Sequence, residues 1–441
     1  MSLELARTLI KELSKWYDEV AVLVFEYDSA MVKLWNSEPS VVQSWIEWEV
    51  SARLAKAGRL LSISLRTRNP SEVVAHASEL AKYAERVEPS ELYAPLPEPS
   101  KCTPIQGAYD SLVEKYLEDP SPLAELLATS ALKQGVDRVA GTVHLGRVTR
   151  TLATSKGFEC VESKTFVEAY ARAFKGEFSG HWAYGSTRVD LDQVKLVGEK
   201  AGTYAQITKN RVSITPGKYR VAISPLVVGN LFNYVARAAS ALSVLMGFSF
   251  FAKFKPGDKL APDWFSLYDK PRDIELQGCG GFDDEGVETA DKPIIGSGTF
   301  RTLLHNTATA TKMQAKSTGN AGWVSPRPWN VEVSRGELRE EELVQEVRNG
   351  LIITNNWYTR LQNYYEGYFS TVSRDAVLVV QNGEVVGDAG RVRIATNFPQ
   401  LLMSIEAATR TPYNIAWWEV PIPTRAPYVL LREVNITKPE V

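Results

Sequence analysis

Residues 46–65 alternate between apolar and polar side chains on both sides of an Ala-Gly pair. A period of two places the apolar side chains of a strand on one face, so each half of this segment predicts a half-buried strand. Gly58 permits a tight reversal between the two halves. The segment therefore predicts a long β-hairpin, whose apolar face carries Ile46, Trp48, Val50, Ala52, Leu54, Leu61, Ile63 and Leu65.

Helical patterns flank this hairpin. Residues 3–17 place apolar side chains at helical spacing, and residues 19–27 follow as an apolar strand. Asn69 and Pro70 indicate the start of another helix, because Asn is a good N-cap and proline is preformed for the first turn. We therefore expect residues 1–88 to form an N-terminal α/β domain.

Five prolines in residues 89–104 mark the end of this unit. Proline fixes φ and lacks an N–H donor, so the segment is expected to be a linker. Residues 105–215 are expected to form a central α/β domain, and residues 216–441 a β-rich C-terminal domain that opens with an apolar helix at 226–245. The predicted class is α+β, with an N-terminal α/β region in two parts followed by a β-rich domain with curved antiparallel sheets.

Charge and cysteine content narrow the classes of function. The chain has 50 Lys and Arg residues against 52 Asp and Glu residues, for a net charge of -2. This balance argues against a dedicated nucleic-acid binder, which needs a basic excess. The three cysteines, Cys102, Cys160 and Cys279, are far apart and include no CxxC pair. We therefore expect reduced thiols and a cytoplasmic protein.

Residues 221–252 contain a single charged residue, Arg237. Proline, glycine and asparagine residues interrupt this stretch, and neither half reaches the ~18 apolar residues that a membrane span needs. The stretch therefore predicts a buried helix, and no membrane is expected among the partners.

The usual catalytic signatures are missing. The four histidines are scattered along the chain, and no HExxH spacing occurs. His305, which precedes a polar segment, is a minor catalytic candidate. Cys279 in the run QGCGG is another. A catalytic thiol needs a nearby base or positive field, whereas the acidic residues after Cys279 would raise its pKa.

Two segments rich in polar residues and glycine lie in the C-terminal half. The run FDDEGV at 282–287 offers the neighbouring carboxylates Asp283, Asp284 and Glu285, which either bind a hard cation or form a solvated turn. The run KSTGNAGW at 316–323 is either a long loop or a place where its glycines let a ligand approach the backbone. A hairpin and a short helix are predicted between them.

The order and spacing of these two segments resemble the TldD/PmbA family, whose members are often labelled modulators of DNA gyrase. The run GLIITNNW at 350–357 is also similar to that family. The resemblance implies a zinc peptidase that acts on unfolded or unstructured peptides. In the TldD branch an HExxxH helix and a C-terminal cysteine bind zinc, whereas the TldE (PmbA) branch lacks them and partners the first branch as a heterodimer.

The corresponding helix in this sequence should be the one at 226–245, where Phe232, Asn233 and Arg237 fall at the three motif positions. Phenylalanine has no lone pair, neutral asparagine cannot act as a general base, and arginine stays cationic. No cysteine follows Cys279. The resemblance therefore implies the TldE (PmbA) branch, with no catalytic or metal-binding residue in this chain and zinc in the TldD-type partner.

We accordingly expect a non-catalytic subunit, inactive alone, that pairs with a TldD-type chain or with itself. A β-rich domain can hold an extended peptide by strand addition. Candidates for a peptide channel or an interface are Asp283, Asp284, Glu285, Ser317, Thr318, Gly319 and Asn320. The alternatives are a self-sufficient peptidase that uses His305 with the acidic run, a homodimeric scaffold, and a DNA-binding regulator of gyrase, which the charge balance disfavours.

Overall fold

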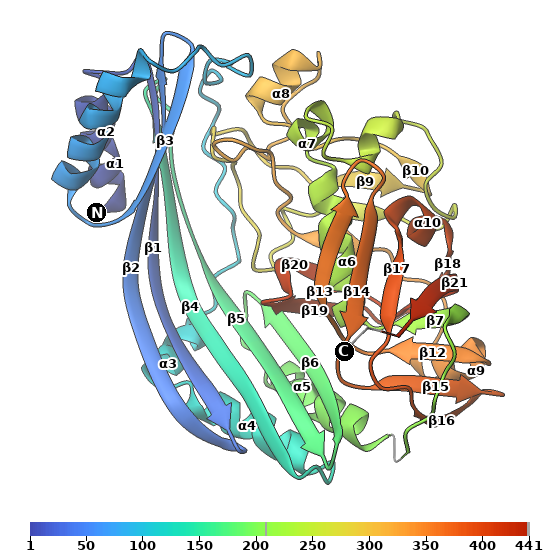
Figure 1. The fold of residues 1–441 in the computed structure, drawn as a ribbon. Helices are drawn as coiled ribbons and strands as arrows, with labels where there is room; N and C mark the ends of the chain where they lie inside the picture. The colour runs from blue at the N-terminus through green and yellow to red at the C-terminus, as the bar shows by residue number, and fades with distance from the viewer. Residues whose placement is uncertain (208–209, 439–441) are drawn as a thin grey trace.

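The computed structural model describes residues 1–207 and 210–438. The strands between residues 19 and 186 build one curved sheet, and the C-terminal half builds two further sheets beside it (Figure 1). This arrangement confirms the predicted α+β class. Strong curvature was expected in the C-terminal sheets, but Figure 1 shows it most clearly in the long N-terminal strands.

A single antiparallel sheet joins both parts of the N-terminal region. Its strand order is β3-β2-β1-β4-β5-β6, and its central pairing sets Val24 of β1 opposite Thr151 of β4. The segments on either side of residues 89–104 therefore share one sheet. The strands are β1 Glu19–Trp35, β2 Glu38–Lys56, β3 Arg59–Arg66, β4 Arg138–Thr154, β5 Glu159–Lys175 and β6 Phe178–Ser186.

The predicted hairpin corresponds to the end of β2 and to β3. Val50 lies opposite Leu65, and the turn at Ala57 and Gly58 has positive φ at both residues. The apolar face of β2 is buried from Trp48 onward. Ile46 is 68% exposed, so the buried face is shorter than the alternation predicted.

Helices cover the two ends of this sheet (Figure 1). At one end lie α1 Ser2–Leu13 and α2 Pro70–Ala84, and the side chain of Asn69 caps α2 as predicted, accepting from the Ser71 N–H at 3.0 Å. At the other end lie α3 Ser111–Glu118, α4 Ser121–Leu132 and α5 Leu191–Gln206. The apolar faces of these helices bury the alternating face of the strands.

The C-terminal region contains two mixed sheets. One has the order β10-β9-β8-β11-β20-β19, and the other has β13-β14-β17-β21-β7-β12-β15-β16, with β18 paired to β21. Two parallel pairs, β11 with β20 and β7 with β12, interrupt the expected antiparallel pattern. The strands are β7 Gly217–Ile223, β8 Leu267–Asp269, β9 Lys292–Gly296, β10 Thr299–Phe300, β11 Val331–Val333, β12 Gly350–Ile353, β13 Asn356–Asn363, β14 Tyr368–Ser373, β15 Val377–Gln381, β16 Glu384–Asp388, β17 Arg393–Asn397, β18 Ile405–Ala408, β19 Tyr413–Trp417, β20 Val420–Ala426 and β21 Val429–Thr437.

The apolar helix expected at 226–245 is divided in two. Helix α6 Pro225–Ala238 is buried in the C-terminal core, and α7 Ala241–Leu245 follows after a break. The break has a tertiary cause, because the backbone at Ala239 and Ala241 exchanges hydrogen bonds with Leu304 instead of continuing the helix. No helix in the described residues is both long and apolar enough to cross a membrane.

The remaining helices are short. They are α8 Thr307–Lys312, α9 Leu343–Val347 and α10 Phe398–Met403, with 3-10 turns at Phe250–Lys253 and Glu340–Glu342. An Asn-Gly pair between two apolar runs predicts a tight hairpin. Asn382 and Gly383 form such a pair, connect β15 to β16, and both have the positive φ that this turn requires.

Residues 85–110 form no helix or strand, but they do not hang free as a solvated linker would. Leu96 is buried, and its N–H donates to the Glu19 carboxylate at 3.1 Å. Ser100 Oγ donates to the Gly286 carbonyl at 2.9 Å. Residues 94–105, which we call the strap, therefore run between the N-terminal sheet and the C-terminal region (Figure 1).

Candidate functional site

The three residues that the resemblance assigns to the degenerate metal motif lie on α6 in different environments. Phe232 is fully buried and packs against Phe265, with ring centroids 5.6 Å apart. Asn233 is also buried, and its side chain binds β20 by accepting from the Ile422 N–H at 2.9 Å and donating to Thr424 Oγ1 at 2.8 Å. Arg237 alone is exposed.

These residues do not fit a zinc ion. A catalytic zinc site needs three lone-pair ligands and an open position. Phe232 supplies no lone pair, the Asn233 amide is committed to β20, and Arg237 is a cation. Within residues 1–207 and 210–438 no three His, Cys, Asp or Glu side chains lie close enough together to hold a metal ion. We therefore derive no metal-dependent step for this chain.

Asp283, the first carboxylate of the acidic run, is fully buried. It accepts hydrogen bonds from the backbone N–H groups of Glu285, Val287 and Ala321 at 2.9–3.0 Å. Burial, reinforced by the nearby Glu285 carboxylate, raises the pKa of Asp283 to about 7 against the opposing effect of these hydrogen bonds. Asp283 therefore closes its own turn and holds residue 321 against it.

Asp284 makes the strongest electrostatic contacts of the run. Its Oδ1 lies 2.6 Å from Arg150 Nη2 on β4, and both of its oxygens lie 3.1 Å from Arg327 Nη2. Arg150 also contacts Glu162 Oε1 at 3.3 Å and donates to the Phe282 carbonyl. Arg150 and Asp284 are both nearly inaccessible to solvent, so this network joins the N-terminal sheet to the C-terminal region in a low-dielectric environment.

Glu285 anchors the acidic run to α8. Its Oε2 accepts from the backbone N–H of Thr307 at 2.9 Å and from the Thr307 hydroxyl. The side chain is buried, and burial raises the pKa of its carboxyl. All three carboxylates thus accept from protein donors. The run is a turn, but its side chains are buried, so the interpretation as a solvated turn is wrong in its solvation.

The second polar segment is ordered by its own side chains. Thr318 Oγ1 accepts from the His305 N–H at 2.7 Å, and Ser317 Oγ donates to the His305 carbonyl at 3.4 Å. Asn320 is fully buried and donates to Asp269 Oδ2 at 2.6 Å. Gly319 has φ +69°, and a Cβ there would lie 2.5 Å from the Glu288 carbonyl.

The two polar segments therefore pack directly against each other. Asp283 accepts from Ala321, the Asp284 N–H donates to the Ala321 carbonyl at 3.2 Å, and Gly319 touches the backbone at Glu288. The structure brings the seven residues predicted as channel or interface candidates into one loop cluster, but most of their polar groups are bound to neighbouring protein groups. Their observed role is to organise the core of this loop cluster.

Neither minor catalytic candidate has a reactive environment. His305 is buried, its Nδ1 lies 3.3 Å from Thr309 Oγ1, and burial lowers the pKa of its imidazole. Cys279 is fully buried, and burial raises the pKa of its thiol. Lys164 donates to the backbone carbonyl of Cys279. Glu285 uses its carboxylate on Thr307, so His305 and the acidic run do not form a catalytic pair.

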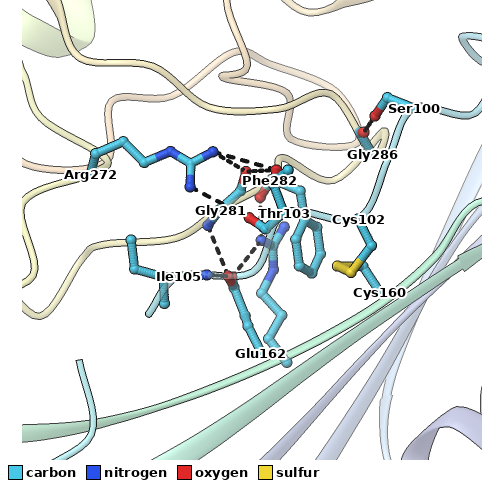
Figure 2. Close-up of a disulfide and its surroundings, with 11 residues drawn as sticks. Ser100, Cys102, Thr103, Ile105, Cys160, Glu162, Arg272, Gly281, Phe282 and Gly286 are labelled. Atoms are coloured by element: carbon cyan, nitrogen blue, oxygen red, sulfur yellow. Dashed lines mark hydrogen bonds and ion pairs between the residues drawn. A yellow bond between two sulfur atoms is a disulfide. The ribbon is translucent and has the colours of Figure 1, made fainter. Parts of the chain in front are cut away.

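The expectation of three reduced thiols is wrong for two of them. Cys102 in the strap and Cys160 in β5 form a disulfide, with Cα atoms 5.3 Å apart (Figure 2). Glu162, two residues further along β5, accepts from the backbone N–H groups of Ile105 at 3.1 Å and Gly281 at 2.8 Å. The disulfide and Glu162 thus fix the strap between β5 and the acidic run. Sequence spacing gave no signal, because 58 residues separate the two cysteines.

A cleft of about 840 Å³ lies beside this network. Its walls come from the N-terminal strands β1, β4 and β5, from the end of α6, and from residues 325–329 and 421–423. Arg237 lines it, together with Arg150, Glu162, Lys164 and Arg327. Of the predicted site residues, only Arg237 faces this cleft.

Sequence reasoning missed the other charged residues of the cleft. Arg150 and Glu162 lie directly opposite each other in the β4–β5 register, equally far in sequence from Lys156 in the connecting turn. A signal for them was present in the sequence. Two opposite charges lie symmetrically about a predicted turn, which indicates a cross-strand pair, and Lys164 follows two positions further along the same face.

Comparisons with known proteins agree on one family. Residues 216–438 match the model of the PmbA/TldA metallopeptidase C-terminal domain, and residues 109–208 match the model of the central domain. A metalloprotease of Methanocaldococcus jannaschii is 30% identical over 251 residues, covering 53% of this chain and 54% of that protein. Metalloprotease PmbA of Escherichia coli is 27% identical, covering 52% and 50%. The chain spans about half the length of the curated relatives it matches.

Solved structures resemble the chain over almost its whole length. A protein described as a modulator of a DNA gyrase from Thermotoga maritima aligns with a TM-score of 0.83 at 23% identity, covering 99% of this chain and 100% of that chain. TldE from Thermococcus kodakarensis aligns with a TM-score of 0.83 at 20% identity, covering 98% and 100%. These similarities show a common fold.

Proposed function

The chain belongs to the PmbA/TldD family, and on that premise we propose that it is a TldE-type, non-catalytic subunit of a zinc peptidase complex. The complex would act on unfolded or unstructured peptides, with zinc held by a TldD-type partner chain. The metallopeptidase names of the related proteins support the reaction class.

The observation that carries this proposal is that Phe232 and Asn233 on α6 have structural roles. Phe232 is a core residue, and Asn233 is a structural link to β20. Restoring zinc ligands at these positions would require rebuilding the packing of α6 against β20, not only exchanging side chains. The chain therefore keeps the family scaffold while two of the three motif positions, Phe232 and Asn233, serve packing.

The chain retains features that a peptide-handling subunit needs. The cleft beside α6 falls in the ~300–1,000 Å³ range typical of ligand sites. Buried ion pairs, the disulfide and the strap hold its two walls in a fixed relation. Because such a cleft is already ordered, the protein itself loses little conformational entropy when a peptide binds.

The test is reconstitution. The purified chain, a TldD-type chain from the same source, and their mixture are each incubated with an unfolded protein substrate, and zinc is measured in each sample. We expect cleavage and zinc only in samples that contain the TldD-type chain, with cleavage strongest in the mixture. A chelator should abolish cleavage, and added zinc should restore it only when the TldD-type chain is present.

Chromatography with light scattering on the same three samples reports the assembly. A complex with the mass of one chain of each kind supports the subunit proposal. Zinc-dependent cleavage by the isolated chain would overturn it, and so would a mixture in which the two chains neither associate nor change the rate of cleavage.

A further inference from the structure

The cleft beside α6 carries a concentration of positive charge that the overall net charge of -2 conceals. Four cationic side chains line it, against a single lining carboxylate, Glu162. Inside a cleft with protein walls on several sides, such charges interact with a ligand more strongly than they would on an open surface.

Two of these cations are already neutralised by the protein. Arg150 pairs with Glu162 and Asp284, and Arg327 pairs with Asp284. These contacts belong to the network that joins the two walls. Arg150 and Arg327 therefore contribute to the wall of the cleft and leave little charge for a ligand.

The other two cations have no carboxylate partner within ion-pairing distance among the described residues. Lys164 donates one hydrogen bond, to the Cys279 carbonyl, although an ammonium group has three donors. Arg237 is exposed at the end of α6 and makes no side-chain hydrogen bond with another described residue. Burial lowers the pKa of Lys164, and a bound anion would stabilise its charged form.

The rest of the wall suits an extended peptide segment that makes few hydrogen bonds with it. Phe25, Tyr27 and Trp329 supply aromatic surface, and Pro421 and Pro423 offer no N–H donors. Strand β20, which contains these prolines, pairs with β19 along one edge and with β11 at residues 424 and 425 on the other. The Asn233 side chain takes the N–H and the carbonyl of Ile422, so little backbone of β20 is left for strand addition. Recognition in this cleft must therefore come from side chains.

We propose that the cleft binds an extended peptide through one carboxylate, held by Arg237 and Lys164. This inference rests on the proposed peptide-handling function and names the chemistry that the chain recognises. The carboxylate comes either from the C-terminus of the peptide or from an acidic side chain. Two uncompensated cations suit one such group, whereas a nucleic acid would need an extended basic stripe.

The test measures peptide binding by the intact chain alone, using isothermal titration calorimetry at low salt. Three short unstructured peptides of Gly, Ser and Ala serve as probes: a free acid, the same sequence as a C-terminal amide, and that amide with one internal Glu. We expect the plain amide to bind weakest. Tighter binding of the free acid assigns the site to a C-terminus, and tighter binding of the Glu-containing amide assigns it to a side chain.

Arg237→Gln is the decisive variant, because the residue is exposed and its loss should not unfold the chain. We expect it to weaken binding of the preferred peptide at least about tenfold, as removal of a charge-assisted contact does. Lys164→Met should act in the same direction, with a thermal melt to verify folding. Arg410→Gln is the matched control, since Arg410 is exposed and pairs with the exposed Glu337, and it should leave affinity within about twofold.

Equal affinity for all three peptides, or equal losses with Arg237→Gln and Arg410→Gln, would overturn the inference. A DNA oligonucleotide that binds more tightly than every peptide would do so as well. Failure of this inference can be told apart from failure of the subunit proposal. If the mixture cleaves its substrate while the isolated chain shows no carboxylate-dependent binding, only the inference is overturned. Carboxylate-dependent binding in a chain that never pairs with a TldD-type subunit removes only the subunit proposal.

Discussion

The guanidinium of Arg150 and the carboxylate of Asp284 meet at 2.6 Å although 134 residues separate them in the chain. Arg150 lies on a long strand of the N-terminal sheet, and Asp284 lies in the acidic run of the C-terminal region. Both are buried, and this contact is one of those that hold the N-terminal sheet and the C-terminal region in a fixed relation beside the cleft.

Asp284→Asn should destabilise the protein strongly. It removes the carboxylate that Arg150 and Arg327 share and leaves a buried guanidinium with Glu162 as its remaining anionic partner. We expect a loss of about 3 kcal/mol in the free energy of unfolding, measured by urea denaturation.

Arg327→Gln provides the comparison for that experiment. Its side chain is 52% exposed and touches the same carboxylate, so solvent screens its charge. The expected loss is below about 1 kcal/mol. If the two substitutions cost the same, burial of the Arg150–Asp284 pair does not decide its strength.

Asp283 should give the protein a pH-dependent stability term. Its pKa rises from 3.8 to about 7 on folding, so the folded state binds the proton more tightly than the unfolded state. This contribution is fully present below the unfolded pKa and is lost as pH rises through about 7. We expect the free energy of unfolding to fall by roughly 1 kcal/mol per pH unit from this group between about pH 5 and about pH 7.

Asp283→Asn isolates this term, because the amide cannot ionise. We subtract the unfolding free energy of the variant from that of the natural chain. The result should fall as pH rises across that window and level off above it. Glu337→Gln, at a side chain that is 94% exposed, should leave the pH profile unchanged. A constant difference between the natural chain and Asp283→Asn would show that Asp283 is ionised throughout.

Gly319 should not tolerate a side chain. Alanine there would pay for the left-handed backbone at φ +69° and would also press against the Glu288 carbonyl. We expect Gly319→Ala to cost more than about 2 kcal/mol. Gly247→Ala is matched, since Gly247 has φ +73° with open space around its Cβ position, and it should cost only about 1 kcal/mol. Equal costs would mean that the loop cluster adapts.

The Cys102–Cys160 disulfide should contribute substantially to stability. It closes a loop of 58 residues, and replacing both cysteines by serine should cost about 4 kcal/mol in the chain-entropy account of cross-links. The strap should also become more accessible to proteases. Thiol titration of the denatured natural chain should detect only Cys279 without reductant and all three cysteines with it.

A reductant supplies the control for that substitution. The natural chain should lose stability when it is reduced, whereas the variant with both serines should not respond. A natural chain that is equally stable with and without reductant would contradict the predicted contribution of the disulfide.

Local patterns predicted much of the secondary structure. The alternation around Gly58, the Asn69 cap and the Asn382-Gly383 turn each depend on a few neighbouring residues, and each appears in the structure. The prediction for the apolar helix at 226–245 failed at its middle, because Leu304, distant in sequence, takes the backbone hydrogen bonds there.

For the candidate site, the sequence predicted the chemical properties of individual side chains but not their burial or their partners. The residue types at 232, 233 and 237 already exclude zinc ligation, because lone pairs and charge are properties of the side chain itself. The two polar segments were singled out as channel or interface candidates, but the sequence did not predict that they are buried. A run of three acidic residues is normally solvated, and only the approach of Arg150 and of backbone donors from residues 307 and 321 makes its burial possible.

The sequence by itself determined many of the strands, helices and turns, and that residues 232, 233 and 237 offer no zinc ligands, because periodicity, caps, turns and ligand atoms are local properties. The tertiary structure alone decided that Cys102 reaches Cys160, that Asp284 reaches Arg150, and that Arg237 and Lys164 line one cleft with no carboxylate of the described residues within ion-pairing distance of either. These facts depend on which distant side chains are brought together away from water, where the energy of a charge or a hydrogen bond is set by its partners.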